Sequence, residues 1–271
     1  MKLIDCFMYF DEDLILDVRL NTLYDKVDRF VIVEATLDHA GNKKKLNFDF
    51  NKFKKFEKKI KYIVVDDLPK EVKRFKKNWS SAHVRDQFQR NALERGYADC
   101  SDEDLIMISD LDEIPRPEKI KEFEIKNKYA CFIHKNFLSK INLLNITEPQ
   151  WGGTKICKKK NIKSPQWLRQ IGIKKRPFWK FYKPKIPQLI KDGGWHFSYI
   201  KSPIGISKKI SSFAHQEFNK QEYTDIQKIE EKMRNNKDIF DRDFEYKKIN
   251  LDNTFPKYIL ENKVKFSDWL A

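Results

Sequence analysis

Two carboxylates stand close together in residues 105–115, and their spacing suggests chemistry more directly than any other feature of this sequence. Asp110 and Asp112 follow residues 105–108, an apolar run that is typical of a strand buried on both faces. Side chains alternate along a strand, so we expect both acids on one face. They would lie at the carboxyl end of a central strand, where open α/β sheets bind ligands.

A divalent metal is the simplest interpretation of this pair, because neighbouring carboxylates repel each other unless a cation lies between them. Mg²⁺ is usually held by one or two carboxylates together with substrate phosphates, and Mn²⁺ accepts the same oxygen ligands. Asp110 and Asp112 therefore predict a Mn²⁺ or Mg²⁺ site. The alternative is an acidic turn without a metal, because Asp-x-Asp also occurs by chance.

Two further groups lie in the last third of the chain. Asp192 precedes a Gly-Gly pair, and Trp195 and His196 follow it. Paired glycines let a backbone approach a ligand closely, and the imidazole lies beside an aromatic ring that could support a sugar. His215 and Glu217 are two residues apart and would not share a helix face. A structural histidine and a polar helix end are the alternative interpretations of these two groups.

A third group lies on the clearest helix of the sequence, predicted over residues 79–96. Arg85 and Gln89 are four residues apart and share a face, and Arg90 is adjacent. These side chains could bind phosphate, although a solvated basic face is an equally good interpretation. Glu34 ends a second buried strand, at a position where a ligand would bind.

The composition excludes several classes of protein. The chain has 271 residues, a formal net charge of +15 and only 8 glycines, and it contains no Gly-rich phosphate loop of either common type. Its 4 cysteines are widely spaced, which argues against a zinc site. The positive charge favours anionic ligands, although lysines that merely solvate the surface would give the same balance. No apolar run approaches the length of a membrane span, so we expect a soluble chain.

Apolar runs alternate with helical patterns and predict an α/β fold with a mostly parallel central sheet and helices on both faces. Residues 139–200 show no regular period, and long irregular segments in a compact domain are usually functional. The strands expected in the sheet are 3–10, 30–36, 61–66 and 105–110, with a further strand at 129–138. The helices expected are 14–27, 52–59, 79–96, 117–124, 206–218 and 225–234.

Together, these groups predict a metal-dependent enzyme that acts on a nucleotide-linked substrate. The chain resembles glycosyltransferase family 17 over roughly residues 3 to 218. Its Ser-Asp-x-Asp-Glu-Ile-Pro and Gly-Gly-Trp-His-Phe-Ser elements are the specific part of the resemblance. The segments that carry it, in order, are 5–7, 30–36, 85–91, 108–115 and 193–198.

The resemblance implies a GT-A type fold over residues 1–218, with residues 219–271 as a charged helical extension packed on it. It implies an inverting transfer from a nucleotide sugar, UDP-GlcNAc in the family's known activity on the β-1,4-linked mannose of glycoprotein glycans. Asp110 and Asp112 match the family's Asp-x-Asp, and His196 falls, by analogy, where many GT-A enzymes supply a late metal ligand. The donor-binding residues expected are Glu34, Arg85, Gln89, Arg90, Asp110 and Trp195.

An inverting transfer also needs a carboxylate that takes the proton of the acceptor hydroxyl. Glu217 is the first candidate and Asp192 the second, while Glu113 should point to the other face of the strand. The expected acceptor is a glycan on a glycoprotein, a lipid or a surface polysaccharide. We expect a cytoplasmic protein with at most peripheral membrane contact and no nucleic-acid partner. The alternatives are a basic nucleic-acid-binding protein and a metal-dependent phosphohydrolase.

Overall fold

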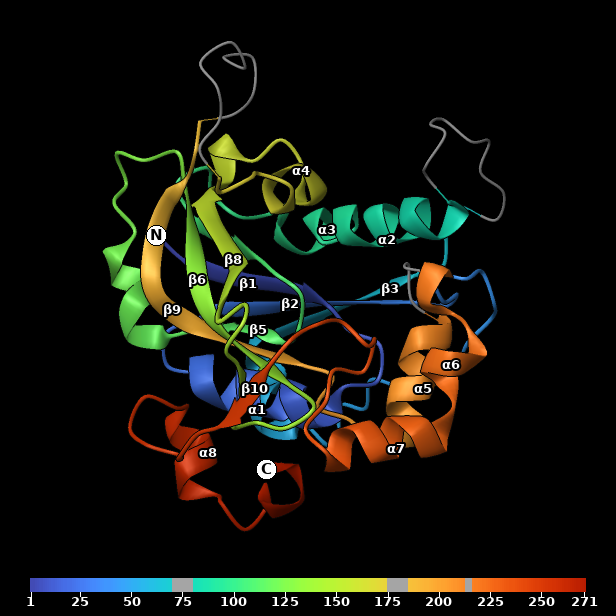
Figure 1. The fold of residues 1–271 in the computed structure, drawn as a ribbon. Helices are drawn as coiled ribbons and strands as arrows, with labels where there is room; N and C mark the ends of the chain where they lie inside the picture. The colour runs from blue at the N-terminus through green and yellow to red at the C-terminus, as the bar shows by residue number, and fades with distance from the viewer. Residues whose placement is uncertain (70–79, 175–184, 213–215) are drawn as a thin grey trace.

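The computed structural model describes residues 1–69, 80–174, 185–212 and 216–271, and a ten-stranded sheet forms its centre (Figure 1). Four strands at one end run parallel, as predicted, and they lie in the order β4-β1-β2-β3, which the sequence did not predict. They alternate with helices along the chain, as a parallel arrangement requires. Their bounds are β1 Leu3–Met8, β2 Arg29–Ala35, β3 Ile60–Val65 and β4 Leu105–Ile108.

The other end of the sheet is largely antiparallel, so the sheet as a whole is mixed and the prediction of a mostly parallel one is corrected. β8 runs antiparallel to β4, and β6, β7 and β10 continue the order. β9 is parallel to β6, and β5 pairs with β9. The bounds are β5 Glu113–Pro115, β6 Tyr129–Leu138, β7 Leu143–Asn145, β8 Gln150–Lys158, β9 Gln188–Ser198 and β10 Tyr246–Lys248.

Two of these strands, β8 and β9, come from the stretch that has no regular period in the sequence. The reason lies partly in its glycines. A Cβ atom on Gly153 of β8 would lie 2.4 Å from Nδ1 of His134 on β6, so only glycine fits beside that ring. Glycine in a strand often marks such a close approach, and it hides the alternation by which a strand is recognised.

Helices cover both faces of the sheet, as predicted (Figure 1). One face carries α1 and α8, and the other carries α2, α3 and α4. The long predicted helix begins at Ser81, capped by the Ser80 hydroxyl, and it is interrupted after Asn91; Trp79 lies outside the described residues. The bounds are α1 Asp13–Leu23, α2 Ser81–Asn91, α3 Glu94–Tyr97, α4 Pro165–Arg169 and α8 Lys257–Glu261. Short 3₁₀ helices span Lys54–Lys59, Pro117–Glu122, Lys159–Asn161, Gln216–Phe218 and Ser267–Trp269.

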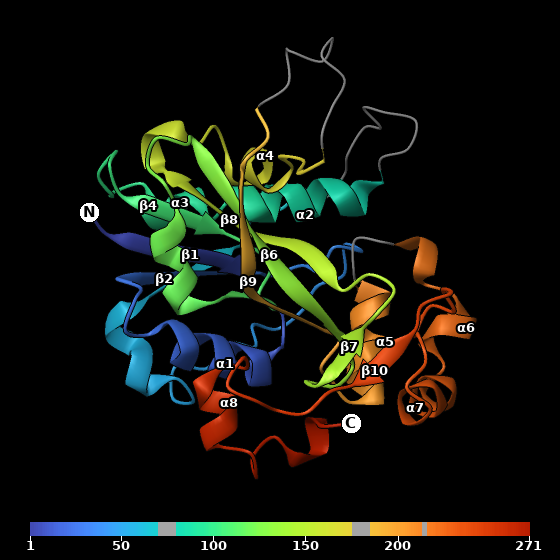
Figure 2. The ribbon, with the colours of Figure 1, turned by 60° about the vertical axis from the view of Figure 1, so that its left-hand side comes forward.

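Three helices form a small layer beside β7 and β10 (Figure 2). They are α5 Pro203–Ser212, α6 Gln221–Thr224 and α7 Ile226–Arg234. Ile206, Ile229 and Phe240 belong to their separate apolar core. Because β10 pairs with β7, residues 219–271 add a strand to the central sheet as well as helices around it. Within the described residues, no helix has both the length and the apolar character that a membrane span requires.

Candidate active site

A cavity of about 580 Å³ lies between the carboxyl ends of β1 and β4 and the C-terminal third of the chain. Its first side comes from the parallel strands and α2, and includes Tyr9, Phe10, Asp86, Gln89 and Arg90. Asp110, Asp112, Trp151, Arg169, His196 and Lys209 lie between the two sides. The opposite side, which we call the C-terminal wall, consists of Phe218, Phe240, Arg242, Phe244 and Tyr246.

The two predicted acids both line this cavity, but they do not lie on a strand. β4 ends at Ile108, and the chain then turns, with the Glu113 N–H donating to the Asp110 carbonyl at 3.1 Å. We call residues 109–113 the acid turn. Asp110 and Asp112 therefore face the cavity because of this turn, and the expected strand alternation is corrected.

Arg19 of α1 holds the acid turn from within the core. Its guanidinium is fully buried and pairs with the equally buried Asp5 of β1 at 2.7 Å. Arg19 Nη2 also donates to the Ser109 hydroxyl at 2.6 Å. Arg19 Nη1 donates to the carbonyl oxygens of Asp110, Leu111 and Glu113 at 3.0, 3.0 and 2.9 Å. A guanidinium offers five donors in a fixed plane, so this one side chain defines the path of the turn.

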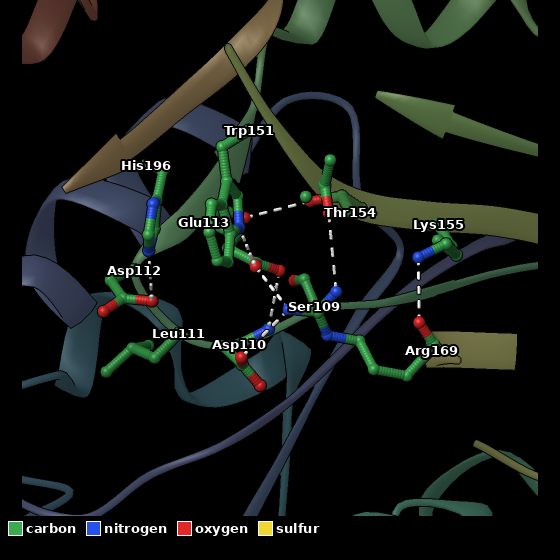
Figure 3. A network of polar contacts seen from close by, with 12 residues as sticks. Ser109, Asp110, Leu111, Asp112, Glu113, Trp151, Thr154, Lys155, Arg169 and His196 are labelled. Atoms are coloured by element: carbon green, nitrogen blue, oxygen red, sulfur yellow. Dashed lines mark hydrogen bonds and ion pairs between the residues drawn. The ribbon is translucent and has the colours of Figure 1, made fainter. Parts of the chain in front are cut away.

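Glu113 holds the acid turn from the other end (Figure 3). Its carboxylate is fully buried and accepts hydrogen bonds from Trp151 Nε1 at 2.6 Å and from Arg169 Nη2 at 2.5 Å. The second carboxylate oxygen accepts the backbone N–H of Asp110 at 3.1 Å. Glu113 is thus occupied as a structural acceptor, and no face of its carboxylate is turned to the cavity.

Asp110 is ion-paired with two arginines. Its carboxylate oxygens lie 3.2 Å from Arg90 Nη2 and 3.1 Å from Arg169 Nη2. Burial opposes the charge of Asp110, but Arg169 and Arg90 outweigh it and hold the pKa of this carboxyl below its usual range. The Asp110 carboxylate therefore stays ionised across the physiological pH range, with the guanidinium groups of Arg90 and Arg169 beside it.

Asp112 lies between a lysine and a histidine. One carboxylate oxygen is 3.5 Å from Lys209 Nζ of α5. The other is 3.9 Å from His196 Nε2 of β9 (Figure 3). The His196 ring stacks on Trp151, with centroids 4.6 Å apart and 19° between the planes. The structure thus brings His196 close to one of the two predicted acids.

Hydrogen bonds fix which nitrogen of His196 carries the proton. Asn136 donates its amide N–H to the Glu148 carbonyl at 3.1 Å, so its amide oxygen faces His196 Nδ1 at 3.0 Å. That oxygen can only accept, so Nδ1 carries a hydrogen and a neutral ring turns its Nε2 lone pair toward Asp112. A lone pair and a carboxylate that face each other form an arrangement that a cation would satisfy.

These donors fit a divalent metal of the kind that substrate oxygens help to hold. Asp112 and His196 converge, and a hydrogen-bonded second nitrogen is the usual setting of a metal-binding histidine. Among the residues that the structure describes, no group of three or more Asp, Glu, His or Cys side chains could hold an ion. Asp110 is already paired with arginines, so water and substrate oxygens would supply the remaining ligands.

The other predicted donor-binding residues divide into two sets. Gln89 and Arg90 line the cavity. Arg85 instead donates to the backbone carbonyls of His39 and Pro69 and braces the neighbouring loops. Glu34 is fully buried, where it accepts from Tyr62 and from the side chain and backbone of the loop at residues 44–48. These contacts give Glu34 a structural role that a strand-end position alone does not reveal.

Three further candidates lie away from the cavity. Trp195 is in the core, where its Nε1 donates to the Thr254 carbonyl at 3.0 Å, because alternation on β9 turns it opposite to His196. Asp192 is exposed on β9, at a backbone φ of 47°. Glu217 is exposed on the 3₁₀ helix Gln216–Phe218, and His215 lies outside the described residues.

Arg169 and Lys209 are the site residues that sequence reasoning missed. Each contacts one of the two predicted acids, Arg169 from α4 and Lys209 from α5. The chain contains 55 lysines and arginines, so no local pattern distinguishes these two from the rest. Trp151 lies in the irregular stretch at residues 139–200, and no local pattern predicted it as a site residue either.

The comparison with protein families agrees with this geometry. The family model for glycosyltransferase family 17 matches residues 1–267. No match was found among curated proteins. The matched range includes the acid turn, β9 and the C-terminal wall, which extends the resemblance beyond residue 218. A match over nearly the whole chain confirms the resemblance: this protein belongs to glycosyltransferase family 17.

Proposed function

We propose that this glycosyltransferase is an inverting, metal-dependent enzyme that transfers a sugar, GlcNAc from UDP-GlcNAc, to a hydroxyl group of a glycan. The observation that carries the proposal is the convergence of Asp112, His196 and three cationic side chains in one cavity. A nucleotide sugar carries a diphosphate, and its departure creates negative charge that such a group of residues would stabilise.

Asp112 and His196 would hold the metal, and Asp110 would keep Arg90 and Arg169 in position beside it. When bound, the ion supplies a Lewis acid that neutralises charge on the leaving diphosphate. Lys209 lies 3.5 Å from Asp112 and 3.4 Å from Glu12, so its ammonium is held at the same place. Burial lowers and these acids raise the pKa of Lys209, with a net increase, so it stays charged.

The two sides of the cavity suggest how the substrates lie. The nucleoside would occupy the side formed by the parallel strands and α2, since the carboxyl ends of parallel strands are the usual place for nucleotides. Tyr9 and Gln89 are on that side. The glycan would contact the C-terminal wall, where Phe240, Phe244 and Tyr246 offer aromatic faces. A glycan on a glycoprotein, a lipid or a surface polysaccharide would fit this description.

The test is titration of UDP and of a panel of nucleotide sugars into the protein by calorimetry, with and without Mn²⁺. We expect UDP-GlcNAc to bind more tightly with Mn²⁺. Asp112→Asn should remove that difference, and Asp110→Asn should weaken donor binding under both conditions. Asp67→Asn, which changes a surface acid paired with Arg95, is the matched control and should bind as the wild type does.

Turnover completes the test. Wild-type protein should release UDP faster when a glycan acceptor is present, and alanine at position 110 or 112 should abolish that release without unfolding the chain. Equal donor binding by Asp112→Asn and the wild type in Mn²⁺ would contradict the metal site. Release of inorganic phosphate without an acceptor would instead indicate a phosphohydrolase.

A further inference from the structure

An inverting transfer requires a base at the acceptor side of the cavity. The acceptor oxygen forms a bond to the anomeric carbon while the bond from that carbon to the diphosphate oxygen breaks. The electron pair of the broken bond leaves with the diphosphate, and the hydroxyl proton passes to the base. The base must therefore be a carboxylate that faces the cavity, can be reached from solvent and has neither a cation nor a hydrogen-bond donor already bound to its oxygens.

Most acids that line the cavity fail this requirement, because other groups already occupy their oxygens. Asp110 and Asp112 are paired with cations, as described above. The remaining acids are occupied as follows: Asp86 by Arg90 at 2.8 Å, Glu12 by Lys209 at 3.4 Å and by the N–H groups of Phe10 and Asp11, and Asp38 by the backbone and side chain of Asn42. An acid in such a pair would lose its partner on accepting a proton.

Glu148 differs from all of these. It lines the cavity on the segment between β7 and β8, its side chain is exposed, and its carboxylate has no hydrogen bond or ion pair within the described ranges. Its backbone is nevertheless fixed at both ends. The N–H donates to the Asn145 side chain at 2.8 Å, and the carbonyl accepts from Asn136 at 3.1 Å.

These backbone bonds place Glu148 beside the predicted metal ligand. The Asn136 amide that donates to the Glu148 carbonyl also accepts from His196 Nδ1 at 3.0 Å. Three residues further on, Trp151 stacks on the same imidazole. Glu148 is thus linked through Asn136 to His196, and its N–H contacts Asn145, which pairs with Tyr246 of the C-terminal wall, where we place the glycan.

We propose that Glu148 is the general base of this enzyme, the catalytic residue that takes the proton from the acceptor hydroxyl. This inference rests on the proposed function. It replaces Glu217 and Asp192, the carboxylates that the sequence suggested, which are exposed outside the residues that line the cavity. An unpaired carboxylate next to the acceptor can take up a proton and release it to solvent without breaking an ion pair.

The experiment compares isosteric amide variants by UDP release from UDP-GlcNAc with Mn²⁺ and a pool of glycoprotein N-glycans. Glu148→Gln should lower kcat by about 100-fold or more, the usual contribution of a general base. Its affinity for UDP and Mn²⁺ by calorimetry should stay within about twofold of the wild type. Glu261→Gln on α8, an exposed acid far along the chain, is the control and should retain wild-type turnover.

Sodium azide separates a base from a residue that merely shapes the site. Azide is an anionic nucleophile with no proton to lose, so it should restore UDP release to Glu148→Gln and form a glycosyl azide. It should add little to the wild type. A positioning role for Glu148 would leave the variant inactive with azide as well.

Several results would overturn the assignment. Glu148→Gln with turnover within about threefold of the wild type, or with UDP affinity lost in parallel, would exclude Glu148 as the base. Loss of turnover in Glu217→Gln or Asp192→Asn, with azide rescue there, would move the role to that residue. In each case the wild type still transfers sugar, so the proposed function stands. If the wild type releases no nucleotide from any donor of the panel, the proposed function fails, and this inference fails with it.

Discussion

Removal of the Arg19 guanidinium should cost this fold far more than removal of any surface ion pair. Arg19 and Asp5 are both fully buried and 2.7 Å apart, and breaking such a pair typically costs ~3–5 kcal/mol because the remaining charge stays unpaired. Domains of ordinary stability unfold with ~5–15 kcal/mol. The variant Arg19→Met, similar in length but uncharged, should therefore be folded but only marginally stable.

The assay is urea unfolding followed by circular dichroism, with the free energy of unfolding obtained by linear extrapolation. Arg95→Met is the matched control, because Arg95 pairs with Asp67 at 2.6 Å but the two side chains are 40% and 51% exposed. That exposed pair should contribute ~1 kcal/mol or less. Adding Asp5→Asn to Arg19→Met should recover part of the loss, because it removes the unpaired buried charge.

The acid turn supplies a second measurement. Arg19 binds three of its carbonyl oxygens, so Arg19→Met should also weaken Mn²⁺-dependent UDP binding under conditions where the variant is folded. Arg19→Lys keeps the charge but loses the planar fork, and its binding should be intermediate. An unfolding free energy for Arg19→Met within ~1 kcal/mol of that for Arg95→Met would refute the reasoning.

Further predictions concern metal binding, pH and packing. His196→Ala should weaken Mn²⁺ and donor binding together, and by more than it weakens Mg²⁺ binding, in calorimetric titrations. Burial opposes the charge of Glu12, but Lys209 outweighs it and the pKa falls from 4.5 to about 2. This lowered pKa stabilises the fold fully above about pH 4.5 and progressively less down to about pH 2, so the stability lost in Glu12→Gln should shrink as pH falls through that window. Gly153→Ala places a Cβ atom 2.4 Å from the His134 ring and should cost ~1–3 kcal/mol in urea unfolding.

The parts of the fold that could be predicted are those whose signal is local. Residues 105–108 are an unbroken apolar run, residues 3–8 are apolar except for Asp5, and both strands lie within the parallel block. Asp110 and Asp112 were found because two carboxylates at the end of a buried strand repel each other unless a cation lies nearby. Both acids line the cavity although the chain turns after Ile108, because a strand end and the turn that follows it lie at the same edge of the sheet.

The partners of these acids could not be predicted, because they are brought together by chain topology. Arg169 is 59 residues from Asp110 along the chain, and only the antiparallel pairing of β8 with β4 brings α4 to that position. Arg19 carried a weak signal that could have been used. It is a charged residue between the buried Val18 and Leu20 of α1, and a buried arginine needs a partner.

Trp195 and His196 show why adjacency in sequence is a poor guide to a shared site on a strand. The sequence placed both beside the ligand, but β9 can turn only one of two neighbours to each face. Trp195 enters the core, and the aromatic ring beside His196 is that of Trp151, which comes from β8. Trp151 also donates to Glu113, so its indole contacts both the His196 imidazole and the buried carboxylate at the end of the acid turn. The metal ligands that we propose are therefore held at fixed separation by residues of β8 and α1, and a donor would meet a site that is already assembled.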